Sequence, residues 1–285
     1  MSEAGSEHKR RASLAPRRAT PRLAAGRARA LGLPTRGTTN ANRLRRVDRW
    51  IQATQVPRLR DAARPLVVDL GYGSSAVTTL ELAERLAPEV PGLEVVGLEI
   101  DPARVAAVAD DRDPPRVDFR VGGFELAGLS PVLVRAFNVL RQYDEASAAR
   151  AWETMCAALG PGGVLVEGTC DEWGRRATWV ALDADGPLTL TLAARVADLD
   201  RPSDLAERLP KALIHHNVPG RPVHALLQAL DAAWAAAAGL STFGPRQRWT
   251  AAVQALADDG WPLVGSTRRW RHGELTVRWS AVAPA

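Results

Sequence analysis

The sequence is poor in cysteine and has no long apolar run, and each shortage excludes a class of protein. Two cysteines in 285 residues, Cys156 and Cys170, provide neither a disulfide framework nor the spacing of a zinc site. We therefore expect a cytoplasmic protein without a metal centre. No apolar run reaches the length of a membrane-spanning helix, and no charged and then apolar leader ends in a cleavage site. No membrane contact is expected.

Positive charge is concentrated at the N-terminal end of the chain. Residues 1–46 hold Lys9 and eleven arginines against Glu3 and Glu7, a net charge of +10, whereas the whole chain carries +5. Residues 1–41 show no sustained apolar period, which predicts a disordered basic tail. Such a tail either makes weak contacts with nucleic acid or reflects arginine-rich coding bias or a start site placed too early.

From residue 42 onward, apolar stretches alternate with helical patterns in a single predicted domain, 42–285. The expected strands are 65–70, 93–99, 117–121, 132–137 and 164–167, and the main expected helices are 42–55, 76–86 and 146–159. Continuous apolar strands separated by helices predict a doubly wound α/β fold with a mostly parallel sheet. A helix over 246–259 and strands 261–264 and 275–279 follow, and these strands predict an antiparallel hairpin at the sheet's edge.

An insertion, 171–243, separates the fifth expected strand from the last helix. It begins with two period-two stretches, 178–182 and 188–192, joined by a strong hairpin signal, and continues to an alanine-rich helix over 223–238. Because an insertion after the carboxyl end of a strand lies over the crevice of such a sheet, we expect a lid that sets substrate specificity.

Two segments predict a nucleotide-type cofactor site. Residues 67–75 (VVDLGYGSS) read as a buried strand, a glycine turn and a helix start, and residues 95–101 (VVGLEID) read as a second strand that ends in an acid. Asp69, directly before the turn, would repel a pyrophosphate and attract the ammonium and sulfonium groups of S-adenosyl-L-methionine (SAM). Glu99 is placed to accept hydrogen bonds from ribose hydroxyls. The alternative role, an acid at a helix N-terminus, fits Asp101 better.

A nicotinamide cofactor is the main alternative. Gly71, Gly73 and Ala76 also fit a dinucleotide fingerprint, which would make the protein an NAD(P)-dependent oxidoreductase on a Rossmann fold. Two observations argue against this interpretation. Asp69 would face the pyrophosphate, and an antiparallel terminal hairpin is atypical of a dinucleotide-binding sheet.

Taken in order, the motifs DLGYGS, GLEIDP, GGFE, Asn138 and PGG, followed by a helix, Gly-Trp and two last strands, resemble the class I SAM-dependent methyltransferases. The resemblance covers about 47–170 and 244–282, and the chain also looks like a group of proteins from high-GC bacteria. It implies a Rossmann-like sheet of seven strands, the last inserted antiparallel, and SAM as the cofactor. It further implies these contacts: Asp69, Gly71, Tyr72 and Gly73 with the methionine part, Glu99 with the ribose, Gly123 and Phe124 with adenine, and Asn138 with the methyl group and substrate.

The chain departs from this family in two places that bear on function. Gly123 stands where an acid often bonds the adenine amino group, so that contact is left to backbone groups. Residues 137–140 (FNVL) lack the Asn/Asp-Pro-Pro-aromatic signature of methyltransferases that act on the amines of nucleic acid bases. This favours a small-molecule acceptor over nucleic acid.

No catalytic residue can be assigned from the sequence. The candidates for a base are Asp171, Glu172, His215 and His216, although vicinal histidines rarely face one way and an ordinary polar loop is favoured. Either an aromatic wall for a substrate or the core would explain three tryptophans of the insertion, Trp173, Trp179 and Trp234. Either an anion site or a solvated turn would explain three arginines near the C-terminus, Arg268, Arg269 and Arg271.

The sequence therefore predicts a SAM-dependent methyltransferase that acts on an unidentified acceptor. Two alternatives stay open beside it. One is the oxidoreductase, and the other is a degenerate SAM-binding domain that binds RNA through its arginine-rich tail.

Overall fold

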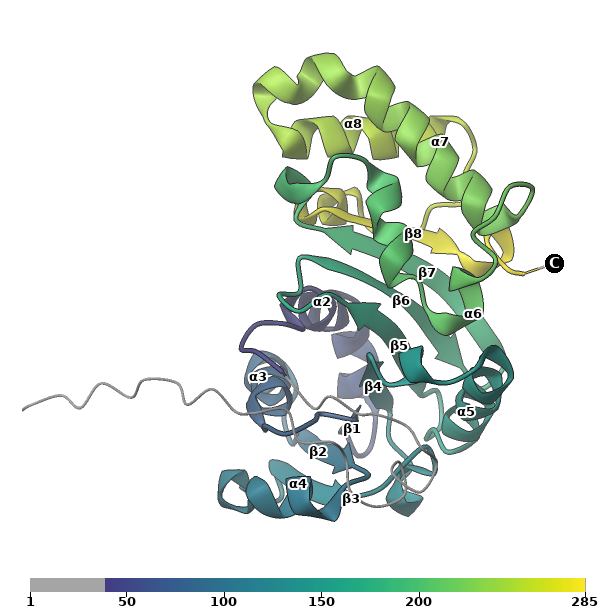
Figure 1. Ribbon diagram of the computed structural model, residues 1–285. Helices are drawn as coiled ribbons and strands as arrows, with labels where there is room; N and C mark the ends of the chain where they lie inside the picture. Colours follow the sequence, from purple (N-terminus) through teal and green to yellow (C-terminus); the bar gives the residue numbers. More distant parts are fainter. Residues whose placement is uncertain (1–38, 285) are drawn as a thin grey trace, which may run out of the picture.

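One sheet of eight strands runs through the computed structural model, which describes residues 39–284 (Figure 1). The strand order is β3-β2-β1-β4-β5-β6-β7-β8. The parallel strands are β1 (Leu66–Leu70), β2 (Glu94–Glu99), β3 (Val117–Val121), β4 (Leu133–Phe137) and β5 (Val164–Cys170). Three antiparallel strands extend the sheet: β6 (Arg176–Asp183), β7 (Gly186–Ala194) and β8 (Glu274–Arg278). The predicted α/β fold with a mostly parallel sheet is confirmed.

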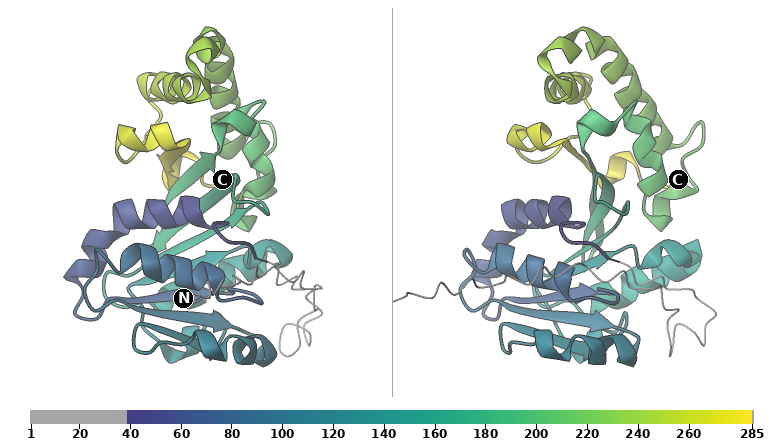
Figure 2. Two further views of the ribbon diagram at one scale, coloured as in Figure 1. Left: turned by 90° about the vertical axis from the view of Figure 1, so that its left-hand side faces the viewer. Right: turned by 60° about the vertical axis from the view of Figure 1, so that its left-hand side comes forward.

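Helices cover both faces of this sheet (Figure 2). One face carries α2 (Arg45–Asp61), α3 (Val77–Leu86) and α4 (Pro102–Ala107), and the other carries α5 (Glu145–Ala157), α6 (Lys211–Ile214) and α7 (Pro222–Ala236), against which α8 (Pro245–Asp258) packs. The short 3-10 segments used below are η4 (Val196–Asp198), η5 (Pro202–Arg208), η6 (Ala237–Phe243) and η7 (Thr267–His272). Each face has its own cluster of buried apolar side chains. The order β3-β2-β1-β4-β5 places a topological switch point between β1 and β4.

The outer part of the sheet corrects the expectation of seven strands. The hairpin expected in the lid is β6–β7, and it adds two antiparallel strands to the sheet beside β5. β6 is buried on both faces, so it behaves as a strand inside the sheet and satisfies the free edge of β5. The last strand, β8, therefore pairs with β7. Residues 261–264 form no strand, and Leu263 makes a single bridge to Val277.

The remainder of the insertion packs against the sheet. Leu205 of η5, Leu213 of α6 and Leu226 of α7 belong to the apolar cluster on the α5 face. α7 and η6 together, Pro222–Phe243, have the length and a mean hydropathy of 1.2 that by themselves would suit a membrane span. Five residues of α7 are buried in the core and none of η6 is, so that 28% of this apolar window is buried.

Candidate functional site

The glycine turn lies at the switch point between β1 and β4. Gly71 and Gly73 have φ values of +75° and +88°, a region that side chains with a Cβ rarely adopt. A Cβ on Gly71 would lie 2.6 Å from Cγ2 of Val139, in the segment that follows β4. The turn therefore needs glycine both for its backbone conformation and for its close approach to the neighbouring loop.

Glu99, at the end of β2, is joined directly to this turn. The N–H of Gly73 donates to Oε2 of Glu99 at 3.0 Å, and the N–H of Ile100 donates to Oε1 at 2.9 Å. Arg104 Nη1 lies 3.5 Å from Oε2. Burial raises the pKa of Glu99, while Arg104 and the backbone N–H groups act in the opposite direction. The structure thus brings together the glycine turn and the acid that the sequence placed at one site.

Asp101 has the separate role that was expected of it. Its carboxylate accepts a hydrogen bond of 3.0 Å from the N–H of Ala103, in the first turn of α4. The capping function therefore belongs to Asp101. Glu99 is left at the turn, and its contact with a ribose stays a prediction.

Tyr72 points its ring into the core. The side chain is buried, and its ring lies edge-on to Phe119 with centroids 5.2 Å apart. Its hydroxyl has no hydrogen-bond partner among residues 39–284. Burial, and then the charges of Glu99 and Asp69, raise the pKa of this hydroxyl. The side chain of Tyr72 is therefore part of the core, and a contact between Tyr72 and the methionine part of the cofactor stays a prediction.

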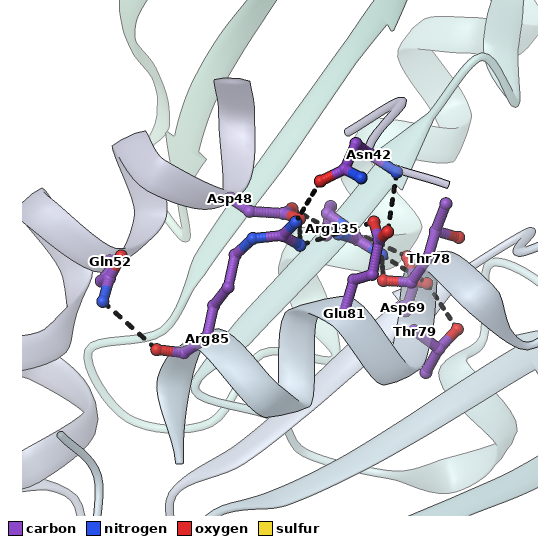
Figure 3. A network of polar contacts seen from close by, with 9 residues as sticks. All are labelled: Asn42, Asp48, Gln52, Asp69, Thr78, Thr79, Glu81, Arg85 and Arg135. Carbon is purple, nitrogen blue, oxygen red and sulfur yellow. Dashed lines mark hydrogen bonds and ion pairs between the residues drawn. The ribbon is translucent and has the colours of Figure 1, made fainter. Parts of the chain in front are cut away.

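Asp69 is held by an arginine from the neighbouring strand (Figure 3). The parallel register sets Asp69 opposite Arg135 of β4. Arg135 Nε lies 2.9 Å from Oδ1 of Asp69 and Nη2 lies 2.6 Å from Oδ2, while the hydroxyl of Thr79 donates to Oδ2 at 2.7 Å. The two charged side chains are 2% and 0% exposed. The carboxylate is therefore compensated, and the argument that a free charge at Asp69 selects the cofactor is wrong. A contact between Asp69 and the methionine part stays a prediction.

The same arginine ties two helices to the sheet beneath the glycine turn (Figure 3). Arg135 Nη1 donates to Asp48 of α2, and Nη2 donates to the carbonyl of Thr78 in α3 at 2.9 Å. Arg85 of α3 also donates to Asp48, at 2.8 Å. Burial raises the pKa of Asp48 to about 6, against the opposing effect of the two arginines. We call Asp48, Asp69, Arg85 and Arg135 the buried ion network.

Sequence reasoning missed Arg135, although the sequence contains a signal for it. Arg135 is the one charged residue in the strand LVRAF, whose five residues are all buried. A strand inside a doubly wound sheet meets apolar layers on both faces, so a charge within it must find a partner. The strand beside β4 in the sheet, β1, carries an acid, Asp69, at the position opposite Arg135.

Asn138 and Cys170 join the ends of β4 and β5. The backbone N–H of Cys170 donates to Oδ1 of Asn138 at 3.0 Å, and Nδ2 of Asn138 lies 3.2 Å from the sulfur of Cys170. Asn138 also has a φ of +60°, an uncommon conformation for a residue other than glycine. Its amide is engaged with β5, and its predicted contact with the methyl group is untested.

Phe124 lies in an aromatic pair beside the same edge of the sheet. Its ring is 5.4 Å from that of Tyr143, which follows β4, in an edge-to-face arrangement. The N–H of Gly123 donates to Oε1 of Glu125 at 2.8 Å. The loops after β3 and β4 thus meet through an aromatic contact whose second partner, Tyr143, was not predicted. Adenine contacts at Gly123 and Phe124 stay predictions.

The other candidates of the sequence do not gather at one place. Asp171 accepts hydrogen bonds from the backbone of Trp173 and Arg175 in the turn between β5 and β6, and His216 lies 2.7 Å from Glu145. Trp179 and Trp234 are buried in the core, whereas Trp173 is 64% exposed. No three His, Cys, Asp or Glu side chains of the part that the structure describes are grouped as metal ligands. These positions supply no common catalytic cluster.

Glu167 is a second buried group that the sequence did not single out. It lies within β5 and is fully buried, and the side chain of Trp152 is the polar neighbour that acts on its carboxyl group. Burial raises its pKa to about 8, so the side chain holds a proton at neutral pH. Asp69 is buried as a carboxylate paired with Arg135, whereas Glu167 is buried in its uncharged, protonated form.

Comparisons with known proteins give partial structural likeness. No family model matches the chain, and no curated protein matches it in sequence. The magnesium protoporphyrin IX methyltransferase of Synechocystis, with bound SAM, is 17% identical over 45% of this chain and 58% of that one, with a TM-score of 0.35. The cyclopropane synthase MmaA2 of Mycobacterium tuberculosis is 22% identical over 41% of each chain, with a TM-score of 0.31.

A third solved structure gives a match of the same kind. The SAM-dependent methyltransferase of Mesorhizobium loti is 22% identical over 43% of this chain and 53% of that one, with a TM-score of 0.32. In all three cases the match spans less than two thirds of the other protein. Scores at this level describe a partial likeness and assign no function.

Proposed function

We propose that the protein binds SAM at the carboxyl ends of β1, β2 and β4 and transfers its methyl group to a small-molecule acceptor. The observation that carries the proposal is the hydrogen bond of 3.0 Å between the N–H of Gly73 and the carboxylate of Glu99. It unites a glycine turn with an acid at the switch point of a doubly wound sheet, where such folds bind nucleotides.

The residues at this edge fit the parts of the cofactor. Gly73, which has no Cβ, leaves room for a ligand to approach the backbone of the turn, whereas the space beside Gly71 is taken by Val139. A carboxylate offers about four acceptor positions, and at Glu99 three backbone N–H groups and Arg104 approach them. The contacts with Asp101 and Arg104 are long, 3.4 and 3.5 Å, so a ribose hydroxyl would replace one of these two. The Phe124–Tyr143 pair provides apolar surface for a purine ring.

For methyl transfer, the protein mainly has to position the cofactor and the acceptor. The bound cofactor supplies an electrophilic methyl group, and the chain must orient that group and exclude water from it. The bond between Asn138 and β5 fixes the loop after β4, and the buried ion network fixes the strands that carry the turn. A base is needed only where the acceptor must lose a proton, so the lack of an assigned catalytic residue is compatible with this chemistry.

The nicotinamide alternative is disfavoured on the topology of the sheet. Since Arg135 compensates Asp69, repulsion of a pyrophosphate no longer argues against a dinucleotide. The strands beyond β5 still argue against a dinucleotide cofactor. β6, β7 and β8 are antiparallel, whereas a dinucleotide-binding sheet continues with parallel strands. The RNA-binding alternative depends on the tail, residues 1–41, of which nearly all lie outside the described residues.

Calorimetric titration with S-adenosylhomocysteine tests the proposal. Wild-type protein should bind it at micromolar concentrations, and Glu99→Gln should weaken binding about tenfold or more, as expected for the loss of a hydrogen bond to a charged group. Glu94→Gln is the matched control, since Glu94 begins the same strand and pairs with Arg64 at the surface. Binding of NAD in place of S-adenosylhomocysteine would overturn the proposal, as would equal affinities for both variants.

A further inference from the structure

A cavity of about 300 Å³ opens between four segments that are far apart in the sequence. They are the first half of α2, the end of β7 with η4, the start of α8, and η7. The registers Cys170↔Ala177, Ala177↔Ala193 and Ala193↔Glu274 place it at the same edge of the sheet as the glycine turn, beyond β6. The cavity is thus separate from the proposed cofactor site, although both lie along one edge.

Arginine dominates the lining of this cavity. The six contributing arginines are Arg45, Arg46, Arg49, Arg195, Arg246 and Arg271. Of the three arginines that the sequence suggested for an anion site, only Arg271 lines it. The lining contains one acid, Glu274, and that carboxylate is bound by Arg269 at 2.7 and 2.5 Å.

Most of these positive charges lack a counter-ion. The side chains of Arg45, Arg49, Arg246 and Arg271 make no hydrogen bond or ion pair with residues 39–284, and Arg195 has only a long contact of 3.6 Å with Asp198. Arg46 donates to the carbonyls of Gly174 at 3.1 Å and His272 at 2.9 Å, which orient its guanidinium without neutralising it. Like charges gathered around a hollow repel one another unless an anion enters.

The pKa values of Arg46 and His272 are lowered beside this group of arginines. Burial lowers the pKa of Arg46 to about 10; the charge of Glu274, and more weakly that of Asp171, opposes this shift, while Arg45 and Arg49 add to it. The pKa of His272 is lowered by burial and by the surrounding arginines, so this ring is neutral at pH 7. The N-terminus of α8, a helix of 14 residues without a side-chain cap, adds its dipole beside Arg246.

We propose that this cavity binds a small polyanion, namely the diphosphate or multiply phosphorylated group of a small molecule. Guanidinium groups match phosphate oxygens in paired hydrogen bonds, and several of them converge here. The volume lies at the lower limit for small-molecule sites, which suits a compact ligand. No Phe, Tyr or Trp lines the cavity, so it offers no platform on which the bases of a nucleic acid strand could stack. The proposal does not depend on methyl transfer.

Titration of the full-length chain with inorganic pyrophosphate, followed by calorimetry, tests this site. Arg49→Gln/Arg271→Gln removes two charges from the cavity. The matched control, Arg268→Gln/Arg278→Gln, removes two charges from exposed arginines outside the lining, one of them in the same η7 segment. We expect the cavity variant to bind pyrophosphate at least about tenfold more weakly and the control to stay within about twofold of wild type.

Three results would overturn the proposal. One is the absence of pyrophosphate binding to the wild-type protein at millimolar concentration. Another is an equal loss of affinity in both variants, which would indicate the general field of the chain. The third is undiminished binding by the cavity variant together with displacement by single-stranded RNA, which would assign the anion to the basic tail. Unfolding temperatures of both variants establish that each is folded, and S-adenosylhomocysteine binding is measured separately, so a failure at either site is recognised.

Discussion

Arginine has opposite surroundings in the buried ion network and in the cavity beside α8. Arg135 is fully buried, and Asp48, Asp69 and the carbonyl of Thr78 occupy its guanidinium. Arg49 and Arg271 are exposed and have no partner within the described part of the chain. Removal from water forces a charge to be paired, whereas hydration lets arginines remain unpaired where a ligand can use them. The number of arginines alone does not distinguish these roles, but their partners do.

The largest effect should come from removing the paired arginine. Arg135→Met leaves Asp48 and Asp69 buried without their principal counter-charge, and we expect the free energy of unfolding to fall by about 3–5 kcal/mol. Arg116→Met, which removes an arginine from an exposed pair with Asp113, should cost less than about 1 kcal/mol. Urea-induced unfolding measures both. If the two variants lost similar free energies of unfolding, burial would not explain the contribution of the buried ion network to stability.

A middle-sized effect concerns a buried acid that is protonated instead of paired. The pKa of Glu167 is about 8 in the folded state, above its ordinary value of 4.5, so the folded protein holds a proton that the unfolded chain releases. Stability contributed by this group is therefore present below pH 4.5 and declines as the pH rises toward 8. Glu167→Gln should raise the free energy of unfolding by about 2 kcal/mol at pH 6 and change it little at pH 4.

Unfolding at the two pH values needs a control from the same part of the fold. Glu153→Gln serves, because Glu153 is exposed on α5, the helix that packs near β5. It should show no such dependence on pH. A pH-independent effect of Glu167→Gln would show that Glu167 is not protonated by burial.

The smallest effect should come from the cavity. Because the guanidinium groups of Arg49 and Arg271 have no hydrogen bond or ion pair in the described chain, Arg49→Gln/Arg271→Gln should change the free energy of unfolding by less than about 0.5 kcal/mol, and any change at low salt should be stabilising. Thermal unfolding at low and high ionic strength measures this, with Arg268→Gln/Arg278→Gln alongside. A loss of several kcal/mol would show that the cavity arginines are structural and would remove the contrast with Arg135.

The parallel half of the fold could be predicted because its signals are local. The run LVVDLGYGSS combines a buried strand, two glycines and a helix start within ten residues, and α3 begins at Val77, one residue after the expected start. Glu99 could be placed at the turn because parallel strands present their carboxyl ends on one edge. These inferences required no knowledge of distant pairing.

The order of the antiparallel strands in the sheet could not be predicted from local signals. The alternation in 178–182 and 188–192 predicts a hairpin but does not say which strand it joins, and β6 and β7 proved to lie between β5 and β8. The partner of Arg135 follows from the register of β4 on β1, which is a tertiary property. The arginine cavity was beyond reach for the same reason, since its four segments meet only after folding.

The place of the hairpin has a consequence for how the sheet is built. From β4 to β8, neighbours in space are also successive strands along the chain. During synthesis each of these strands therefore emerges next to a partner that is already available, and this half of the sheet can grow outward by one strand at a time. The opposite half grows from β1 through β2 to β3, also in chain order. The single pairing that must wait for an intervening pair of strands is that of β4 with β1, the one that brings Arg135 to Asp69.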